Sequence, residues 1–231
     1  MARVFDRNMF IMLFSIMIGI VIITFFVADI MRKSQIDEIE ERHIKEIKTI
    51  EKKNINFTSK FLDSLTSLNL AKKYRMEGEI DYQLGNAFYK NILSETNKTR
   101  FDNYKGYITS NCSSAMDNFL NSYMNFNDSI GNFNQSKNYT EYSVYLNLGD
   151  LYINYSKSGA RLTQLRFDIS KYLLYMGENL TFINGTVGFS QNISNLTALL
   201  DGALEEYMLE EELYLGLEDL IELYELYEPE R

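Results

Sequence analysis

The sequence predicts an all-α protein in which one N-terminal transmembrane helix continues into a long helix and then into a helical bundle. Three observations support this class. The 231 residues contain one proline, Pro229, so almost nothing interrupts a helix. Glycine is scarce, at 12 residues, whereas all-β sandwiches and barrels spend more glycine and proline on turns. Apolar residues make up 45% of the chain, which is too many for an intrinsically disordered protein.

Residues 1–8 are a short N-terminal tail, and residues 9–28 are the predicted transmembrane anchor. The stretch from Met9 to Ala28 contains no charged residue. A helix of this length spans about 30 Å, which matches the hydrocarbon core of a bilayer. A cleaved signal peptide is the alternative, but its apolar region is shorter and ends in a small-x-small site, where this chain has Phe26. We therefore expect the chain to contact the lipid bilayer through residues 9–28.

Residues 29–75 are predicted to form a charged juxtamembrane helix. An apolar stripe begins at Ile36 and advances mainly in steps of three and four residues, which is helical periodicity. Acidic and basic residues three or four apart fill the other faces and stabilise an exposed helix. The stripe has two interpretations: it packs on the chain's own domain, or it pairs with a second copy in a coiled coil, which would make the protein a homo-oligomer.

Residues 76–231 are predicted to form the helical bundle domain, ending in an acidic helix. The expected helices cover residues 87–93, 112–124, 142–155, 162–176 and 196–227, and the expected connections cover residues 96–102, 125–140 and 177–188. Two Leu-Gly-x-x-aromatic fragments, which begin at Leu84 and Leu148, resemble parts of the tetratricopeptide pattern. Repeated helical hairpins are therefore an alternative to a simple bundle.

The sequence contains 11 Asn-X-Ser/Thr triplets, all beyond the anchor. Chance pairing of its 22 asparagines with its 30 serines and threonines would give about three. The excess indicates N-glycosylation, which takes place outside the cytoplasm. The candidate glycosylation sites are Asn56, Asn97, Asn111, Asn127, Asn134, Asn138, Asn154, Asn179, Asn184, Asn192 and Asn195.

The charges that flank the anchor indicate the opposite topology. Arg3 and Arg7 precede the anchor, and a larger number of basic residues, beginning with Arg32 and Lys33, follows it. The positive-inside rule would place the C-terminal side in the cytoplasm, but long domains translocate largely regardless of charge. The triplets therefore favour an extracytoplasmic domain.

No residue pattern predicts catalysis, metal binding or cofactor binding. The single histidine, His43, and the single cysteine, Cys112, have no second ligand or activating partner nearby in the sequence. The net charge of −9 argues against nucleic acid as a partner, because phosphate binding requires a basic surface. The acidic residues between Asp201 and Glu230 are expected to form a solvated helix face, with a docking surface for a basic partner as the alternative.

We therefore expect a non-enzymatic, single-pass membrane glycoprotein that acts as a structural or protein-interaction module, for example as a subunit of a cell-envelope complex. Two alternatives come from other classes. One is an extracytoplasmic domain that senses a small molecule and signals through a partner. The other is a cytoplasmic adaptor of the tetratricopeptide type. A protein partner is expected in each case, and the sequence does not identify it.

Overall fold

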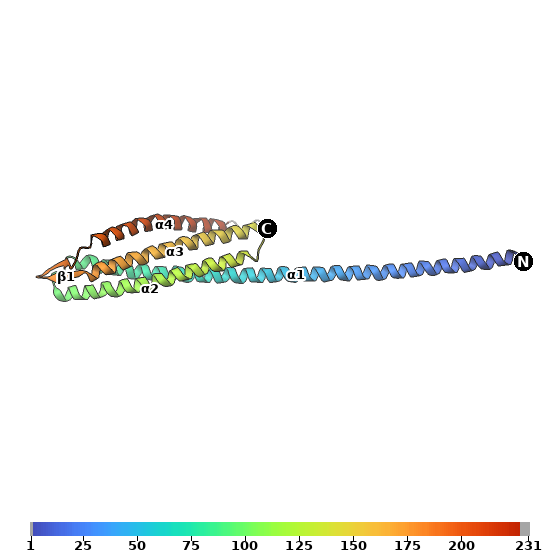
Figure 1. Ribbon diagram of the computed structural model, residues 1–231, viewed down its shortest axis with the longest axis horizontal. Coiled ribbons are helices and arrows are strands. Elements are labelled where there is room, and N and C mark those ends of the chain that lie inside the picture. The colour runs from blue at the N-terminus through green and yellow to red at the C-terminus, as the bar shows by residue number, and fades with distance from the viewer. Residues whose placement is uncertain (1, 227–231) are drawn as a thin grey trace. The chain divides into compact units, whose positions relative to one another are not determined.

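The computed structural model describes residues 2–226, and the side chains of residue 12 and of residues 14–224. The fold is all-α, as predicted. The chain divides into two compact units between Lys53 and Asn54. Its elements are α1 (Ala2–Ile92), α2 (Lys98–Lys137), α3 (Ser143–Glu178), β1 (Leu180–Ile183), β2 (Thr186–Phe189) and α4 (Ser194–Leu226) (Figure 1).

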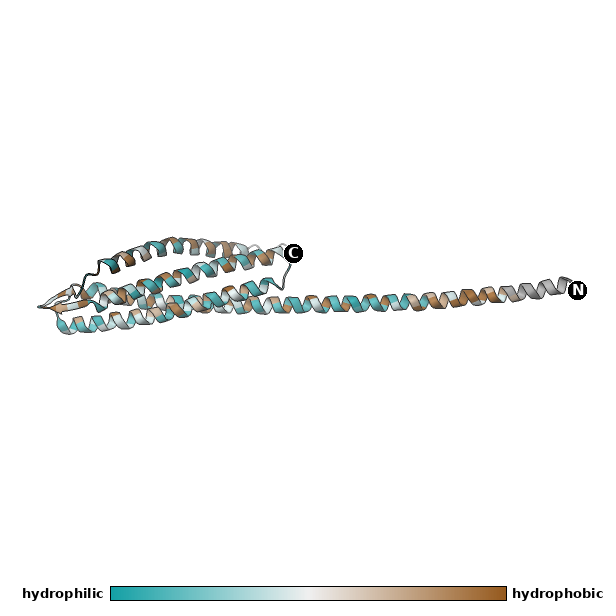
Figure 2. Ribbon diagram, viewed as in Figure 1, coloured by the Kyte–Doolittle hydropathy of each residue, from teal (hydrophilic) through white to brown (hydrophobic). Residues whose placement is uncertain are grey.

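The first unit is the part of α1 up to Lys53. Beginning at Phe14, it contains the one stretch of the described chain that is long and apolar enough to cross a membrane, and none of that stretch is buried by protein. Phe25, for example, is 77% exposed. Figure 2 shows the apolar residues of this stretch in brown, followed by a mostly hydrophilic helix. A single apolar helix of this kind is able to insert into a bilayer.

The second unit is a bundle whose core depends on α2. In the second half of α2, the inward-facing positions alternate between large and small residues in steps of three and four, which keeps one face of the helix toward its neighbours. These six positions are Phe119, Ser122, Phe126, Ser129, Phe133 and Ser136, and all are fully buried. The hydroxyls of these three serines have hydrogen-bond partners within the bundle. Ser122 Oγ, for example, donates to the Ala71 carbonyl of α1 at 2.8 Å.

Glycines on the neighbouring helices receive the large residues of α2. A Cβ atom added at Gly78 of α1 would lie 2.8 Å from the Phe119 ring, and one added at Gly159 of α3 would lie 2.4 Å from the Phe126 ring. Real Cβ atoms essentially never approach another heavy atom so closely. These two glycines therefore allow α1 and α3 to pack closely against the phenylalanine side chains of α2.

The polar loop predicted at residues 125–140 is wrong, because α2 continues as a regular helix to Lys137. Its inward-facing residues keep the helical spacing through this region, so tertiary packing overrides the low helix propensity of asparagine and serine. The outward-facing asparagines also bond to the helix itself. Asn127 and Asn134 donate their side-chain amides to the carbonyls of Tyr123 and Ile130, four residues earlier, at 2.9 and 3.0 Å.

Other predicted breaks are also absent. The separate helices expected at residues 142–155 and 162–176 are both parts of α3. The juxtamembrane helix expected at residues 29–75 and the helix expected at residues 87–93 are likewise joined in α1, which continues to Ile92. The tetratricopeptide-like fragments at Leu84 and Leu148 lie inside α1 and α3. These helices have 91 and 36 residues, so each is longer than a whole tetratricopeptide unit of about 34 residues. The predicted acidic C-terminal helix matches α4 as far as the described residues extend.

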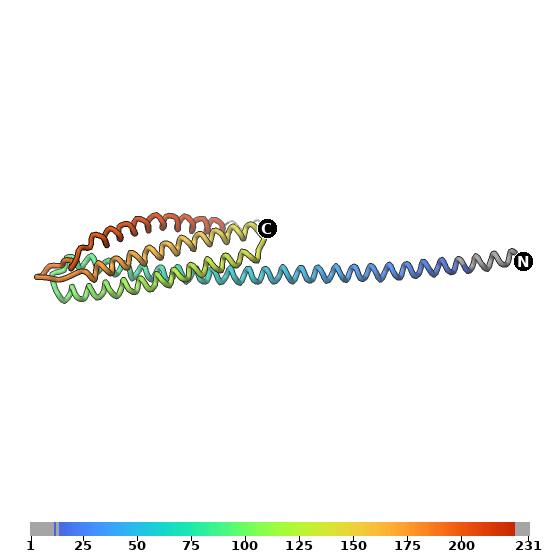
Figure 3. Tube along the Cα trace, viewed as in Figure 1, coloured from blue at the N-terminus to red at the C-terminus, as the bar shows by residue number. Residues whose placement is uncertain are grey.

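The connection predicted at residues 177–188 contains a β-hairpin that the sequence analysis missed. Strand β1 pairs with β2 in antiparallel register, from Leu180 opposite Phe189 to Ile183 opposite Thr186. Both turn residues have positive φ, 53° at Asn184 and 82° at Gly185, which suits a two-residue turn between twisted strands. Figure 3 shows the chain reversing direction at this hairpin before α4 runs back along the bundle.

Candidate functional site

The 11 candidate glycosylation asparagines all lie outside the core. Eight are exposed: Asn97, Asn127, Asn134, Asn138, Asn154, Asn184, Asn192 and Asn195. The other three, Asn56, Asn111 and Asn179, are partly exposed. Each asparagine therefore has at least part of its surface open to solvent in the folded chain.

Three of the triplets have a hydroxyl residue with a structural role. Ser129, Ser136 and Ser156 are fully buried. The hydroxyls of Ser129 on α2 and Ser156 on α3 lie 3.2 Å apart, and Ser136 donates to the Phe133 carbonyl at 2.8 Å. Packing alone accounts for these small residues, so their triplets are weaker evidence for glycosylation. The other eight triplets end in residues that are exposed or partly exposed.

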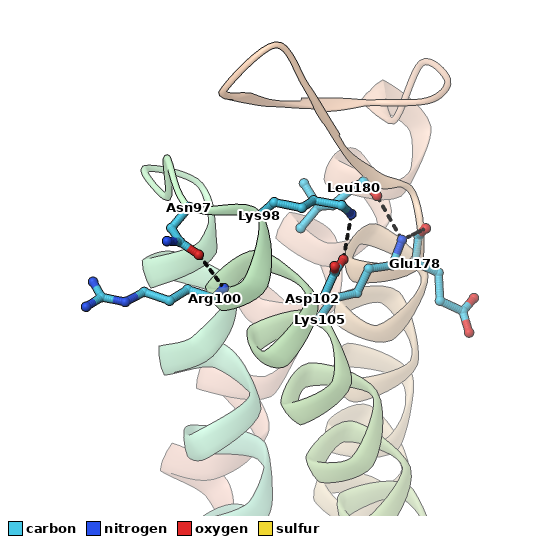
Figure 4. Close-up of polar contacts among 7 residues, drawn as sticks. All are labelled: Asn97, Lys98, Arg100, Asp102, Lys105, Glu178 and Leu180. Carbon is cyan, nitrogen blue, oxygen red and sulfur yellow. Dashed lines mark hydrogen bonds and ion pairs between the residues drawn. The ribbon is translucent and has the colours of Figure 1, made fainter.

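Five acceptor asparagines belong to segments at the hairpin end of the bundle. Figure 4 shows one of them, Asn97, beside the contacts that join α2 to the hairpin. There, Asn97 caps α2 by accepting a hydrogen bond from the Arg100 amide at 3.1 Å. Lys105 of α2 donates to the carbonyls of Glu178 and Leu180, both at 2.8 Å, and so joins α2 to the start of the hairpin. The five acceptors in the segments at this end are Asn97, Asn179, Asn184, Asn192 and Asn195.

The two side chains most suited to catalysis by their chemistry are those of His43 and Cys112, and both lie in places unsuitable for it. His43 is 70% exposed, and the nearest charged group is Glu46, at 3.7 Å. Cys112 is fully buried in the bundle opposite Gly85. Burial raises the pKa of its thiol to about 12, so the thiol is protonated at neutral pH and is a poor nucleophile.

Most of the acidic side chains of α4 that the structure describes lie on a solvated face, as expected. Six of them are exposed: Asp201, Glu205, Glu206, Glu212, Asp219 and Glu222. Three are partly buried: Glu210, Glu211 and Glu218. Glu210 and Glu218 bond to other helices of the bundle, whereas Glu211 accepts a hydrogen bond from Tyr207 of α4 itself. Glu210, for example, accepts a hydrogen bond from Ser158 of α3. The acidic residues of α4 therefore include groups that attach this helix to the bundle.

Glu218 is the centre of a polar cluster that joins α1, α3 and α4. Its carboxylate accepts hydrogen bonds from Lys72 at 2.9 Å and from the Tyr155 hydroxyl at 2.7 Å. The Tyr155 and Tyr214 hydroxyls also form a hydrogen bond with each other, and both tyrosines are 1% exposed. Burial raises the pKa of Glu218, but the hydrogen bonds from Tyr155 and Lys72 outweigh it and leave that pKa below its ordinary value. The carboxylate is therefore ionised and held in place.

Arg166 of α3 forms a second polar cluster. Its side chain is 13% exposed and pairs with Glu79 of α1, with 2.8 Å between Arg166 Nε and the carboxylate. Its guanidinium lies over the Tyr207 ring of α4 at 3.8 Å and near the Tyr82 ring of α1 at 4.8 Å. The sequence analysis missed this residue, although it falls at an inward-facing position four residues after Leu162. A lone cation on a buried stripe is a signal that would have identified it.

The pocket between α2 and α3 is small. It is lined by Phe119, Leu120, Tyr123, Thr163, Gln164 and Phe167 and has a volume of about 220 Å³. Small-molecule sites usually enclose about 300–1,000 Å³. No Asp, Glu, Lys, Arg or His side chain lines it. This pocket therefore gives little support to the small-molecule sensing alternative.

Among the side chains that the structure describes, those of residue 12 and residues 14–224, there is no group of three or more His, Cys, Asp and Glu arranged to hold a metal ion. The two polar clusters are tightly packed between helices, and their geometry indicates a role in holding the bundle together. The features open to a partner are the exposed asparagines and the exposed apolar residues. No protein family, curated protein or solved structure matches the chain.

Proposed function

We propose that the protein is a single-pass membrane glycoprotein, anchored through residues 9–28, with its helical bundle on the extracytoplasmic side. In this proposal the bundle is a non-enzymatic structural or interaction module, such as a subunit of a cell-envelope complex. The observation that carries the proposal is the set of 11 acceptor triplets, none of which has its asparagine in the core. The apolar stretch of α1 supports the anchor.

Glycopeptide analysis of the protein purified from its native membranes tests this proposal. We expect sugar on the exposed asparagines of the hairpin end, including Asn184 and Asn192. In the native host, Thr186→Ala removes the triplet of Asn184 and should lower the intact mass by one glycan. Thr186→Ser keeps this triplet and should retain the sugar on Asn184.

A chain without sugar, isolated from a host that glycosylates other surface proteins, would contradict the extracytoplasmic placement. That result would make the cytoplasmic adaptor the leading function. Sugar on Asn184 in both Thr186 variants would instead mean that glycosylation of Asn184 does not depend on the Asn-X-Ser/Thr triplet.

We also propose that the protein self-associates through residues 36–55 of α1. Ile36, Ile39 and Ile44 recur eleven residues later as Ile47, Ile50 and Ile55, and all six are exposed. An 11-residue repeat has 3.67 residues per turn and favours a right-handed supercoil of helices. Two copies anchored in one membrane would present these stripes in parallel.

Disulfide cross-linking in native membranes tests this association. Ile47→Cys lies on the stripe, whereas Thr49→Cys lies on the opposite face two residues later. Cys112 can remain in place because its thiol is buried and protonated. We expect rapid dimer formation for Ile47→Cys and slow formation for Thr49→Cys. Equal rates for the two variants would contradict a specific interface.

A further inference from the structure

Helix α4 has an exposed apolar stripe that the bundle does not use. We define the α4 outer stripe as Leu209, Leu213, Gly216 and Leu220, which follow one another at steps of four, three and four. The three leucines are 71%, 54% and 50% exposed. Together with Glu212 and Leu217 they line a shallow depression of about 470 Å³. This spacing forms a continuous seam along one face of a helix.

The opposite face of α4 provides its attachment to the bundle. Tyr207, Tyr214 and Ile221 are buried at steps of seven residues. The clusters at Arg166 and Glu218 add ion pairs and hydrogen bonds on the same side. The leucines of the outer stripe therefore contribute little to folding, and their exposure carries a solubility cost that a partner would remove.

Gly216 provides independent support for a missing neighbour. Glycine destabilises a helix interior relative to alanine, and Gly78 and Gly159 occur where a facing side chain leaves no space for a Cβ atom. A Cβ atom added at Gly216 meets nothing within 4 Å. Three other helical glycines of the bundle, Gly106, Gly131 and Gly202, are also open. The residues three and four positions from Gly106 and Gly131 are polar, and Gly202 lines a depression that includes the charged residues Arg161, Asp168 and Glu206. Gly216 instead lines a depression with four leucines and Glu212, where another helix could approach closely.

The acidic residues beside the α4 outer stripe indicate which kind of partner helix would bind there. Glu205, Glu212 and Asp219 flank it, and within the described chain none of the three has a cationic partner. Residues 201–230 contain no lysine or arginine. A second copy of α4 would therefore bring like charges together, whereas a partner with basic residues beside its apolar seam would pair with them.

We propose that the α4 outer stripe docks an amphipathic helix of a partner protein whose apolar seam is flanked by lysine or arginine. Leucine side chains of the partner would fill the depression around Gly216, and its basic residues would meet Glu205, Glu212 and Asp219. This inference rests on the proposed function, because it specifies the partner of the interaction module.

Binding of a designed peptide to the full-length protein in phosphatidylcholine nanodiscs tests the proposal. The probe is a fluorescent helical peptide with a leucine seam and lysine at the flanking positions. A matched peptide carries glutamate in place of lysine, and empty nanodiscs give the background. We expect the lysine peptide to bind saturably and more weakly at high salt, and the glutamate peptide not to bind.

Two leucines of α4 with nearly equal exposure provide matched variants. Leu213 is 54% exposed on the stripe, and Leu215 is 52% exposed outside it. We expect Leu213→Gln to weaken binding by about 10-fold or more and Leu215→Gln by less than about twofold. Gly216→Leu keeps the stripe apolar but fills the depression. It should also weaken binding, whereas a non-specific apolar patch would bind more tightly after this change.

Equal effects of the two leucine variants, tighter binding by Gly216→Leu, or equal binding of both peptides would overturn the proposal. Dimers that Leu213→Gln abolishes would also overturn it, because they would assign the stripe to a second copy. These outcomes are independent of the glycan analysis. A bare chain that binds the lysine peptide contradicts only the membrane side, and a glycosylated chain that does not bind it contradicts only the docking surface.

Discussion

Replacing Gly159 by alanine is expected to destabilise the bundle by about 1–3 kcal/mol, the usual cost of overpacking a close-packed core. The added Cβ atom would lie 2.4 Å from the Phe126 ring, which is itself fully buried and has little room to move. This cost exceeds the gain in helix propensity that alanine brings. Chemical denaturation of the full-length protein in mild detergent, followed by circular dichroism, measures the free energy of unfolding.

Gly216→Ala is the matched control, because Gly216 is also in a helix interior but faces open space. We expect this change to stabilise the protein by up to about 1 kcal/mol, the difference in helix propensity between the two residues. The two glycine variants should therefore shift the free energy of unfolding in opposite directions. Shifts of the same sign would mean that α2 and α3 are not as closely packed at Gly159 as the structure indicates.

Arg166→Ala is expected to destabilise the protein by about 3 kcal/mol, toward the lower end of the range for breaking a buried ion pair. The variant leaves the Glu79 carboxylate, which is 27% exposed, without its partner at 2.8 Å. It also removes the cation that stacks on Tyr207 of α4. Arg166→Met should lose less stability because it preserves the packing of the aliphatic stem. Denaturation under the same conditions measures both variants.

Arg161→Ala serves as the control for this prediction. Arg161 lies five residues earlier on α3 and pairs with Glu206 of α4 at 2.6 Å, but both side chains are about half exposed. Exposed pairs of this kind contribute between about 0 and 1 kcal/mol. A loss of stability as large as that of Arg166→Ala would show that charge alone, without burial, holds α4 to the bundle.

The parts of the fold that could be predicted from the sequence are those with a strong local signal. The uncharged run of residues 9–28 and the scarcity of proline are enough to indicate an apolar helix followed by an all-α domain. The acidic C-terminal helix could be located because its leucines and tyrosines recur at helical spacing. The hairpin also had a local signal, Asn184-Gly185 between apolar residues, which the sequence analysis did not use.

The errors occurred where the core is made of small or polar residues. Ser122, Ser129 and Ser136 are buried, yet serine is typical of loops, so residues 125–140 were interpreted as a connection. Leu120 and Met124, which hydrophobicity alone would place on the apolar face, are exposed. Hydrophobicity alone cannot identify a face on which alternate positions are serine. The spacing of Phe119, Phe126 and Phe133 at seven residues would have identified it.

The candidate sites divide in the same way. The Asn-X-Ser/Thr triplets are local and could be counted from the sequence. The contacts of Arg166 and the open space at Gly216 depend on the register between helices that are far apart in the sequence, so no local pattern contains them. The outward orientation of Leu209 and Leu213 also requires knowledge of which face of α4 the tyrosines occupy.

The burial of three triplet serines has a consequence for the order of events during biosynthesis. An enzyme that reads the hydroxyl of Ser129, Ser136 or Ser156 cannot reach it once α2 and α3 have packed together. Asn184, in contrast, lies in an exposed turn whose Thr186 remains accessible. Sugar on Asn127, Asn134 or Asn154 would therefore record modification of a nascent chain. The ratio of occupancy between these positions and Asn184 would report how quickly the bundle closes after translocation.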